Sequence, residues 1–286
     1  MNFGGRREVK TNLTSRQARR LNLFFGHEQM FKLINKQIIA SNIKRLDIVA
    51  PMVVKKFQPG QFVMLGLTPE SEKIPLAIAD VDAYKDSIAL IIKEQGSITQ
   101  ALGQLAIHDS VYSILGPLGT PATVKKVGTV MFVAVGIGIA QILPVCRAYR
   151  HIGNKTLGLI GGRNRREIIL ESQMRIACQK LYLTTEDGSF ERRGTPATIL
   201  RDLVTKEKVD MVYAAGPTEF LHGIAEITRA QSVKTFVQVN PVMLDGTGIC
   251  GSCRVNVGGK LRLACVEGPE FDAHQIDFND FKMRHG

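Results

Sequence analysis

The stretch Thr129-Val-Met-Phe-Val-Ala-Val135-Gly136-Ile-Gly138 decides the fold class of this 286-residue chain. Residues 129–135 form a continuous apolar run, which is typical of a parallel strand buried on both faces of a sheet. Glycines follow the run, and residues 140–149 have the composition of a helix. A buried strand that turns through glycine into a helix predicts a parallel α/β sheet.

The same order of strand and helix recurs through residues 123–236. Further strands are predicted at 156–162, 180–185 and 211–217, and further helices at 166–175, 195–205 and 219–231. Alternating elements of this kind build a parallel sheet. Glycines follow the strands as Gly136-Ile-Gly138, Gly161-Gly162 and Gly216-Pro217. They fall at the strand ends where open α/β sheets bind ligands.

Residues 31–118 have a different pattern, with short apolar segments separated by glycine and proline turns. Strands are predicted at 31–40, 43–49, 61–67, 87–93 and 110–115, with a short helix at 98–105. Several strands at close spacing predict an antiparallel barrel. The chain is long enough for two such domains and a small appendix.

Three of the five cysteines lie near the C-terminus, in Asp245-Gly-Thr-Gly-Ile-Cys250-Gly-Ser-Cys253 and at Cys265. Thiolates on a glycine-rich loop are typical of an iron–sulfur cluster. The three thiolates leave one ligand to be found, and the carboxylate of Asp245 is a harder donor that can bind iron. We therefore favour a 2Fe–2S cluster on these four residues. A structural zinc ion and three uncoordinated cysteines are the alternatives.

The two remaining cysteines, Cys146 and Cys178, fall on predicted helices and are expected in the core. An odd number of cysteines argues against a disulfide framework, and cluster thiolates suit a reducing cytoplasm. The longest apolar run, residues 129–145, is interrupted by glycine, glutamine and proline and is shorter than the ~20 apolar residues of a membrane helix. No secretory signal is apparent. We expect a cytoplasmic protein without a membrane partner.

The net charge of +11 is unevenly distributed along the chain. Near the N-terminus a single acid, Glu8, stands among the bases Arg6, Arg7, Lys10, Arg16, Arg19 and Arg20. A basic tail of this kind is disordered or docks on an acidic partner. It also has the arginine-rich, acid-poor character of an organelle transit peptide, without a convincing amphipathic stripe. Nucleic-acid binding would need aromatic residues interleaved with the basic ones, and the chain has no Trp. We expect no nucleic-acid partner.

The glycines after residue 135 could seat a nucleotide pyrophosphate on the N–H groups of a helix N-terminus. The full G-x-G-x-x-G pattern is not met because residue 141 is Gln. Glycine at a tight strand–helix turn is the plain alternative. Arg163 is a candidate partner for a phosphate or ribose, or else a solvated arginine.

Two segments of the predicted barrel also suit a nucleotide cofactor. Lys73 precedes the proline-fixed segment Pro75-Leu76-Ala77, whose extended backbone suits a flat ring. Gly96-Ser97-Ile-Thr99 precedes the short predicted helix and offers N–H and hydroxyl donors to a pyrophosphate. A barrel, a nucleotide-binding sheet and a cysteine loop in this order form a coherent electron-transfer unit.

This order resembles the ferredoxin–NADP reductase superfamily, and the motif Asn240-Pro-Val-Met-Leu-Asp245 with its three cysteines strengthens the resemblance. Within the superfamily, the chain is similar to the small FAD and 2Fe–2S subunits of NADH-dependent ferredoxin:NADP oxidoreductases, the electron-bifurcating transhydrogenases also described as sulfide dehydrogenases. The electron-transfer subunit of dihydroorotate dehydrogenase B is a more distant relative, with cysteine at the position of Asp245. Aspartate here favours the cluster over zinc, and the bifurcating branch over the dihydroorotate branch.

The resemblance implies a subunit that passes electrons between NAD(P)H, FAD and a 2Fe–2S cluster within a larger oxidoreductase. The implied partner is a larger flavoprotein and iron–sulfur subunit, with ferredoxin as a further candidate. The implied organisation is a basic extension over 1–30, an FAD-binding barrel over 31–122, an NAD(P)-binding α/β domain over 123–236 and a 2Fe–2S domain over 237–286.

The resemblance also implies the residues of each site. Lys73, Pro75, Leu76 and Ala77 would lie along the flavin, and Gly96, Ser97 and Thr99 would hold the FAD pyrophosphate. The nicotinamide nucleotide would be held by Gly136, Gly138, Gly162, Arg163, Gly216 and Pro217.

The chain departs from the family pattern at several of these positions. Lys73 stands where arginine is usual and lacks the bidentate fork of a guanidinium. Ala77 stands where a hydroxyl residue is usual, and Gln141 where proline is usual. Two alternatives therefore stay open: an electron-transfer subunit of dihydroorotate dehydrogenase, and a non-catalytic adaptor with decayed flavin and nucleotide sites. NADPH stays open beside NADH, because Arg163, Arg165 and Arg166 follow the second strand of the predicted sheet.

Overall fold

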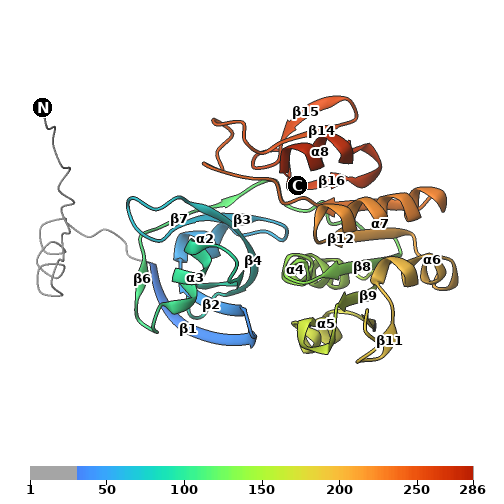
Figure 1. Cartoon of the computed structure of the whole chain (residues 1–286), viewed down its shortest axis with the longest axis horizontal. Coiled ribbons are helices and arrows are strands. Elements are labelled where there is room, and N and C mark those ends of the chain that lie inside the picture. The colour runs from blue at the N-terminus through green and yellow to red at the C-terminus, as the bar shows by residue number, and fades with distance from the viewer. Residues whose placement is uncertain (1–30, 286) are drawn as a thin grey trace, which may run out of the picture. The chain divides into compact units, whose positions relative to one another are not determined.

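The computed structural model of the protein describes residues 31–285 (Figure 1). The basic extension predicted over residues 1–30 lies outside the described residues. The account below concerns the barrel, the α/β sheet and the C-terminal segment.

The barrel is made of seven antiparallel strands in the order β6-β1-β2-β5-β4-β3-β7. Their bounds are β1 (Phe31–Ala40), β2 (Ile43–Val49), β3 (Phe62–Gly66), β4 (Ile74–Asp82), β5 (Ser87–Lys93), β6 (Ser110–Val111) and β7 (Ser113–Leu118). Only Tyr112 separates β6 from β7, so the two edges of the sheet are held close together and the barrel is nearly closed. The predicted antiparallel barrel is confirmed.

Alternate residues of these strands fill the barrel with a core of its own, which includes Leu33, Leu46, Ile88 and Leu90. Two short helices, α2 (Pro51–Lys56) and α3 (Ser97–Gln104), lie in the connections between strands. The short helix predicted at 98–105 is therefore present, shifted by one residue. No helix was predicted at α2, which begins with Pro51 in its first turn.

The α/β sheet has the strand order β11-β10-β9-β8-β12-β13-β16. Its strands are β8 (Thr129–Val135), β9 (Lys155–Gly162), β10 (Lys180–Thr185), β11 (Arg192–Arg193), β12 (Met211–Ala215), β13 (Lys234–Gln238) and β16 (Glu270–Asp272). All pairs are parallel except β13 with β16. The prediction of a parallel sheet holds for the central strands, and the antiparallel edge strand makes the whole sheet mixed.

Helices cover both faces of this sheet (Figure 1). They are α4 (Gly138–His151), α5 (Glu171–Ala177), α6 (Pro196–Lys206) and α7 (Thr218–Ala230). Alternating strand residues separate the two cores: Phe132 packs with α4 and α5, whereas Met131 packs with α6 and α7. The core on the α4 face also takes in Ala79 and Ile91 of the barrel, which joins barrel and sheet.

The helix predicted over 166–175 is wrong in detail. A short 3-10 turn covers Arg165–Glu167, and α5 begins only at Glu171. Ile168, Ile169 and Leu170 lie between them and are all buried. The backbone leaves the right-handed helical region at Leu170, which separates the 3-10 turn from α5. Leu170 has a positive φ of 52°.

Cys178 directly follows α5, whereas Cys146 lies within α4. Both are buried, and their sulfur atoms are 3.5 Å apart. They are core residues, as predicted, although Cys178 lies just outside its helix.

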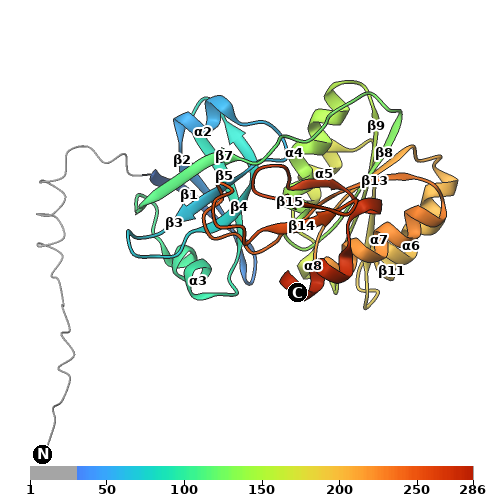
Figure 2. The same cartoon turned by 90° about the horizontal axis from the view of Figure 1, so that it is seen from above.

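The C-terminal segment adds a hairpin of β14 (Arg254–Val257) and β15 (Lys260–Leu263), then β16 and α8 (Phe278–His285). Figure 2 shows this segment, in red, over both the barrel and the α/β sheet. Because β16 pairs with β13, the segment adds an edge strand to the α/β sheet, whereas β14 and β15 form a separate two-stranded sheet. The domain boundary predicted at residues 236 and 237 falls inside β13.

The structure also bears on membrane crossing. Within residues 31–285, no helix is both long and apolar enough to span a membrane.

The first prediction concerns the glycine at the start of α4. A Cβ atom on Gly138 would meet the backbone of Ala215 at 2.6 Å and the nitrogen of Gly216 at 2.9 Å. We expect Gly138→Ala to lower the free energy of unfolding by roughly 1–3 kcal/mol, as overpacking usually does. Urea unfolding followed by circular dichroism measures this.

Gly223 on α7 is the matched control, because a Cβ atom there meets nothing within 4 Å. Gly223→Ala should be neutral or stabilise by about 0.5–1 kcal/mol, since alanine favours the helix. Equal effects of the two substitutions would contradict the close approach at Gly138.

Candidate functional site

The predicted nucleotide glycines lie at the carboxyl edge of the α/β sheet, where the chain order reverses between β8 and β12. Open α/β sheets bind ligands at such a switch point. Gly136 and Gly138 follow β8, and Gly216 and Pro217 follow β12. Gly136 has a φ of +55° and open space around it, which leaves its backbone accessible. The structure therefore brings the glycines of both strands together at one edge.

Arg163 lies at the neighbouring strand end but is engaged locally. Its Nε donates to Glu167 Oε1 at 2.8 Å, and its backbone N–H donates to the other carboxylate oxygen at 3.2 Å. This guanidinium lowers the pKa of Glu167. Gly162 packs beside the same glutamate: a Cβ atom added to Gly162 would lie 2.9 Å from the Cβ atom of Glu167. A phosphate would have to compete with Glu167 for Arg163.

A cavity of about 230 Å³ lies between β4 of the barrel and the N-terminal turn of α4. Pro75, Leu76 and Ala77 line it, as the flavin prediction requires. Its mainly apolar walls and flat strand backbone suit an aromatic ring system. The residues fit an isoalloxazine.

The other predicted FAD residues lie outside the lining of this cavity. Gly96, Ser97 and Thr99 form the start of α3, where the Thr99 hydroxyl accepts from the Gly96 N–H at 3.1 Å and donates to the Gly96 carbonyl at 3.0 Å. Thr99 thus shapes the turn that exposes the helix N-terminus. Lys73 is exposed just before β4.

Sequence analysis missed most of the cavity lining. The further lining residues are Gly60, Phe62, Ile91, Ile137, Ala140, Gln141, Gln238, Val239, Asn240, Pro241, Met243 and Pro269. They come from distant parts of the chain, so no local spacing could have grouped them. The Asn240-Pro241 pair was the available signal, since it opens the motif that leads to the cysteines.

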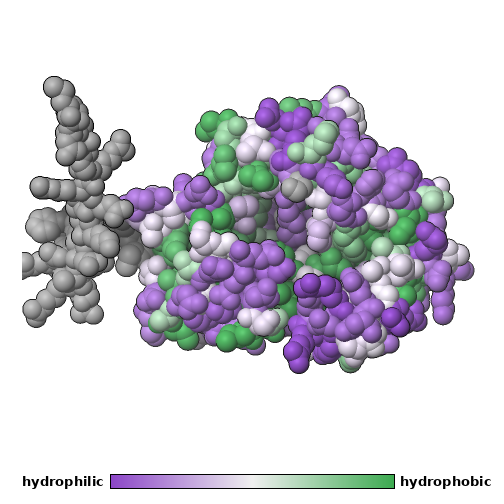
Figure 3. Space-filling view, viewed as in Figure 1, coloured by the Kyte–Doolittle hydropathy of each residue, from purple (hydrophilic) through white to green (hydrophobic). Residues whose placement is uncertain are grey.

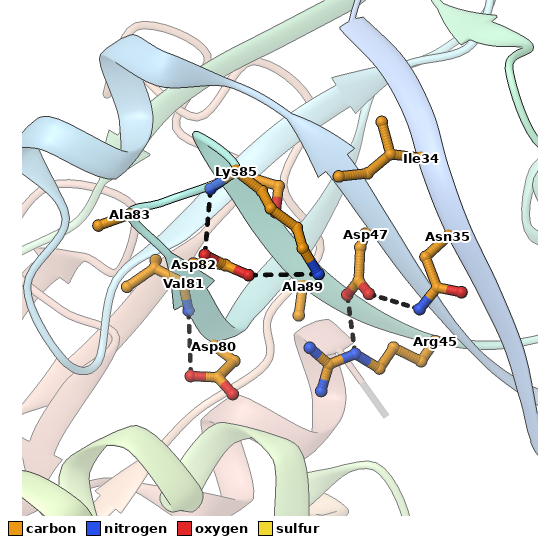
Figure 4. Close-up of a pocket in the computed structure, with 11 residues that line it drawn as sticks. Ile34, Asn35, Arg45, Asp47, Asp80, Val81, Asp82, Ala83, Lys85 and Ala89 are labelled. Atoms are coloured by element: carbon orange, nitrogen blue, oxygen red, sulfur yellow. Dashed lines mark hydrogen bonds and ion pairs between the residues drawn. The ribbon is translucent and has the colours of Figure 1, made fainter.

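A second, larger cavity of about 510 Å³ lies over β1, β2, β4 and β5 (Figure 4). Its charged side chains are all paired, Arg45 with Asp47 at 2.7 Å, Lys85 with Asp82 at 3.6 Å, and Asp80 with Arg147 of α4 at 2.8 Å. None of the predicted site residues lines it. It contributes nothing to the candidate site.

The four predicted cluster ligands lie in two contacting pairs, Cys253 with Cys265 and Cys250 with Asp245. Cys253 and Cys265 are buried, and their sulfur atoms are 3.2 Å apart. Cys250 is exposed, and its N–H donates to Asp245 Oδ2 at 2.8 Å. The loop is wrapped tightly, with Gly246 at φ +80° against the side chains of Met64 and Leu118.

The ionisation of these thiols follows from their surroundings. Burial, and then the neighbouring Cys253, raise the pKa of Cys265 to about 12. A hydrogen bond from Ser252 lowers the pKa of Cys250. The pKa of Asp245 is also lowered, mainly by the Thr247 backbone N–H. Two buried thiols in contact ionise together only beside a cation, which is what a metal centre supplies.

Within residues 31–285, no three His, Cys, Asp or Glu side chains converge on one metal position. Both Asp245 oxygens are engaged by its own loop, through Thr247 and Cys250. The donor set of three thiols and a carboxylate on a tight loop fits a cluster in composition. Ligation by Asp245 would require its carboxylate to turn out of these hydrogen bonds.

Comparison with known proteins bears on both sites. Residues 240–277 match the family model described as the iron–sulfur cluster binding domain of dihydroorotate dehydrogenase B. The chain is 32% identical over 259 residues to the Thermotoga maritima dihydroorotate dehydrogenase B (NAD(+)) electron transfer subunit homolog, covering 91% of this chain and 92% of that protein. The chain belongs to the family of dihydroorotate dehydrogenase B electron-transfer subunits and their homologues.

Two further similar proteins extend the comparison. An uncharacterized Clostridium beijerinckii protein encoded in the adh 3′ region is 36% identical over 264 residues, covering 89% of each chain. A solved chain of the NADH-dependent reduced ferredoxin–NADP oxidoreductase, described for flavin-based electron bifurcation, superposes with a TM-score of 0.85. It is 32% identical and covers 91% of this chain and 94% of its own.

These matches confirm the predicted ferredoxin–NADP reductase superfamily and the role of the chain as an oxidoreductase electron-transfer subunit. They also imply a partner subunit, because the family consists of subunits of larger complexes. The individual site residues stay predictions.

The second prediction tests the cysteine ligands. We expect Cys250→Ser, Cys253→Ser and Cys265→Ser to lose most of the bound iron and the visible absorption of the anaerobically purified protein, because each removes a thiolate. Iron and acid-labile sulfide assays measure the loss.

Cys146→Ser is the control, since this thiol is buried in α4 and contacts Cys178 rather than the loop. It should retain its iron. Zinc in place of iron and sulfide in the parent protein would favour the structural zinc alternative.

Proposed function

We propose that this chain is the small subunit of an NAD(P)H-dependent oxidoreductase complex, in which it binds FAD at the barrel, a nicotinamide nucleotide at the α/β sheet and a 2Fe–2S cluster on the cysteine loop. A bound flavin would exchange a hydride with the nucleotide as two electrons and exchange single electrons with the cluster. The protein contributes binding, orientation and separation from water.

One observation carries this proposal: the aromatic-sized cavity and the cysteine loop share a stretch of backbone. Asn240, Pro241 and Met243 line the cavity directly before Asp245, and Pro269 lines it shortly after Cys265. The segment that borders the flavin cavity on one side therefore enters and leaves the cysteine loop. A flavin and a cluster held here would be neighbours.

The cysteine loop packs directly against the barrel. A Cβ atom on Gly246 would meet Leu118 Cδ1 at 2.9 Å and Met64 Sδ at 3.2 Å, so the loop rests directly on β3 and β7. A glycine is needed for this approach, because φ is +80° and the space is filled. The separation of the two cofactors would be fixed by packing rather than by a flexible linker.

The nucleotide would enter at the switch point between β8 and β12. There the N–H groups at the start of α4 would bind the pyrophosphate. Ile137 and Ala140 of this turn also line the flavin cavity, so a nucleotide bound here would reach it.

An apolar surface surrounds the cysteine loop and suits a partner subunit. Val242, Leu244, Ile249, Leu261 and Val266 are all exposed, with Ile249 at 88%. Figure 3 shows hydrophobic surface over the C-terminal segment. Exposed apolar groups gathered in one place mark interaction sites. We propose that the larger subunit docks here and exchanges electrons with the cluster.

The third prediction tests electron transfer. Anaerobic addition of NADH or NADPH to the purified protein should bleach both the flavin absorption and the cluster absorption. Cluster absorption without flavin, and no response to either nucleotide, would instead support the adaptor alternative. The adaptor alternative is based on Ala77, which lines the cavity but lacks the hydroxyl group that is usual in the family.

The fourth prediction tests the docking surface. Ile249→Asp should weaken association with the larger subunit by at least tenfold, because it buries a charge at an apolar contact. Co-purification and analytical ultracentrifugation of the two subunits measure this.

Ile176→Asp is the control, since Ile176 is 73% exposed on α5, away from the loop. It should leave association unchanged. Association that tolerates Ile249→Asp, with the cluster intact, would contradict docking at the loop.

A further inference from the structure

Two amide side chains meet at the mouth of the 230 Å³ cavity. Gln141 Nε2 donates to Asn240 Oδ1 at 2.6 Å, and the return contact from Asn240 Nδ2 to Gln141 Oε1 is 3.4 Å. Both residues line the cavity. Gln141 lies one turn into α4, and Asn240 lies two residues after β13. Segments a hundred residues apart in the chain thus present a matched amide pair to one space.

The pair is accessible and only half satisfied. Asn240 is exposed and Gln141 partly so, and one of their two mutual hydrogen bonds is short while the other is long. An amide has two N–H donors and a carbonyl with two lone pairs, so both side chains retain capacity for a further partner. Because an exposed hydrogen bond contributes little net free energy, a ligand can exchange with it.

We propose that Gln141 and Asn240 recognise the carboxamide of the nicotinamide ring. A primary carboxamide has the same donors and acceptor as the two side chains, so it can take the place of one amide in the pair. This inference rests on the proposed function, because it needs a nicotinamide nucleotide at the start of α4.

The position of the pair supports the nicotinamide end of the ligand. Gly136 and Gly138, at the N-terminus of α4, are where the pyrophosphate would bind, and Gln141 is three residues further along the same helix. This first turn of α4 lines the same cavity as Pro75 and Ala77, where a flavin ring would lie. The reactive ring must lie against the flavin, which brings its carboxamide to the mouth that the two amides flank.

Gln238, also in the cavity lining, is not a competing candidate. It is buried, and its Nε2 already donates to the Tyr213 hydroxyl at 3.1 Å. The amide of Gln238 is therefore already engaged by Tyr213, whereas the side chains of Gln141 and Asn240 have no third hydrogen-bond partner within residues 31–285.

The fifth prediction uses an analogue that lacks one donor group. The 3-acetylpyridine analogue of NAD⁺ replaces the carboxamide nitrogen by a methyl group. Calorimetric titration of the anaerobically purified, flavin-containing protein should show NAD⁺ binding several-fold, up to about tenfold, more tightly than the analogue, as one net hydrogen bond allows. Gln141→Leu and Asn240→Leu should weaken NAD⁺ binding and bring this ratio close to one.

Gln231→Leu is the matched control, because it removes an exposed amide hydrogen bond, to the Arg201 carbonyl, at the end of α7. It should keep the discrimination of the parent protein. Gln141→Glu serves as a second variant that keeps the shape of the side chain and an acceptor for the carboxamide N–H groups but loses the N–H donors of Gln141. It should retain discrimination against the analogue, which lacks only the carboxamide N–H groups.

Each outcome separates the inference from the function on which it rests. If the parent protein binds NAD⁺ and Gln141→Leu still discriminates fully between NAD⁺ and the analogue, the amide pair does not recognise the carboxamide. If Gln141→Leu alters the flavin spectrum while the ratio is unchanged, the pair serves the flavin edge, and the inference is wrong. If the parent protein binds neither nucleotide, the proposed function itself fails.

Discussion

The hydrogen bonds between residues 119–123 and residues 266–270 are the constraint on which the site depends. The Thr120 N–H donates to the Gly268 carbonyl at 2.7 Å, and the Thr120 hydroxyl donates to the Val266 carbonyl at 2.8 Å. The Thr123 N–H donates to the Glu270 carboxylate at 3.1 Å. The first segment leaves the barrel and the second leaves the cysteine loop, so these bonds fix the loop to the barrel. Together with the packing of Gly246 against Met64 and Leu118, they hold the cavity and the loop in one place.

Much of the fold follows from residue pattern. The continuous apolar run at 129–135 and its glycines predict β8 and α4, because a strand buried on both faces tolerates no polar alternation. Several elements were not predicted, and for two of them the physical reason is clear. The segment Ile74–Asp82 is a strand despite Pro75, since proline is tolerated where a ladder hydrogen bond is not needed. The strand Glu270–Asp272 is short and mixed in composition, and only its pairing with β13 makes it part of the sheet.

The site was predictable in its local motifs and not in its assembly. The glycine turns at strand ends and the cysteine loop are each made of residues close together in the sequence. The structure has them at the predicted positions. The cavity wall is different, because Gly60, Gln141 and Asn240 meet only after the barrel, the sheet and the C-terminal segment have packed. Arg163 was predicted as a nucleotide ligand, and its local ion pair with Glu167 depends on the break before α5. The orientation of Asp245 likewise depends on the loop amides that its carboxylate meets.

A crystal structure of the anaerobically purified protein, with anomalous diffraction recorded at the iron edge, tests the central claim most directly. The account predicts two iron atoms beside Cys253 and Cys265, and flavin density between β4 and the first turn of α4. A single zinc atom at the cysteines, or a flavin bound elsewhere on the barrel, would contradict it.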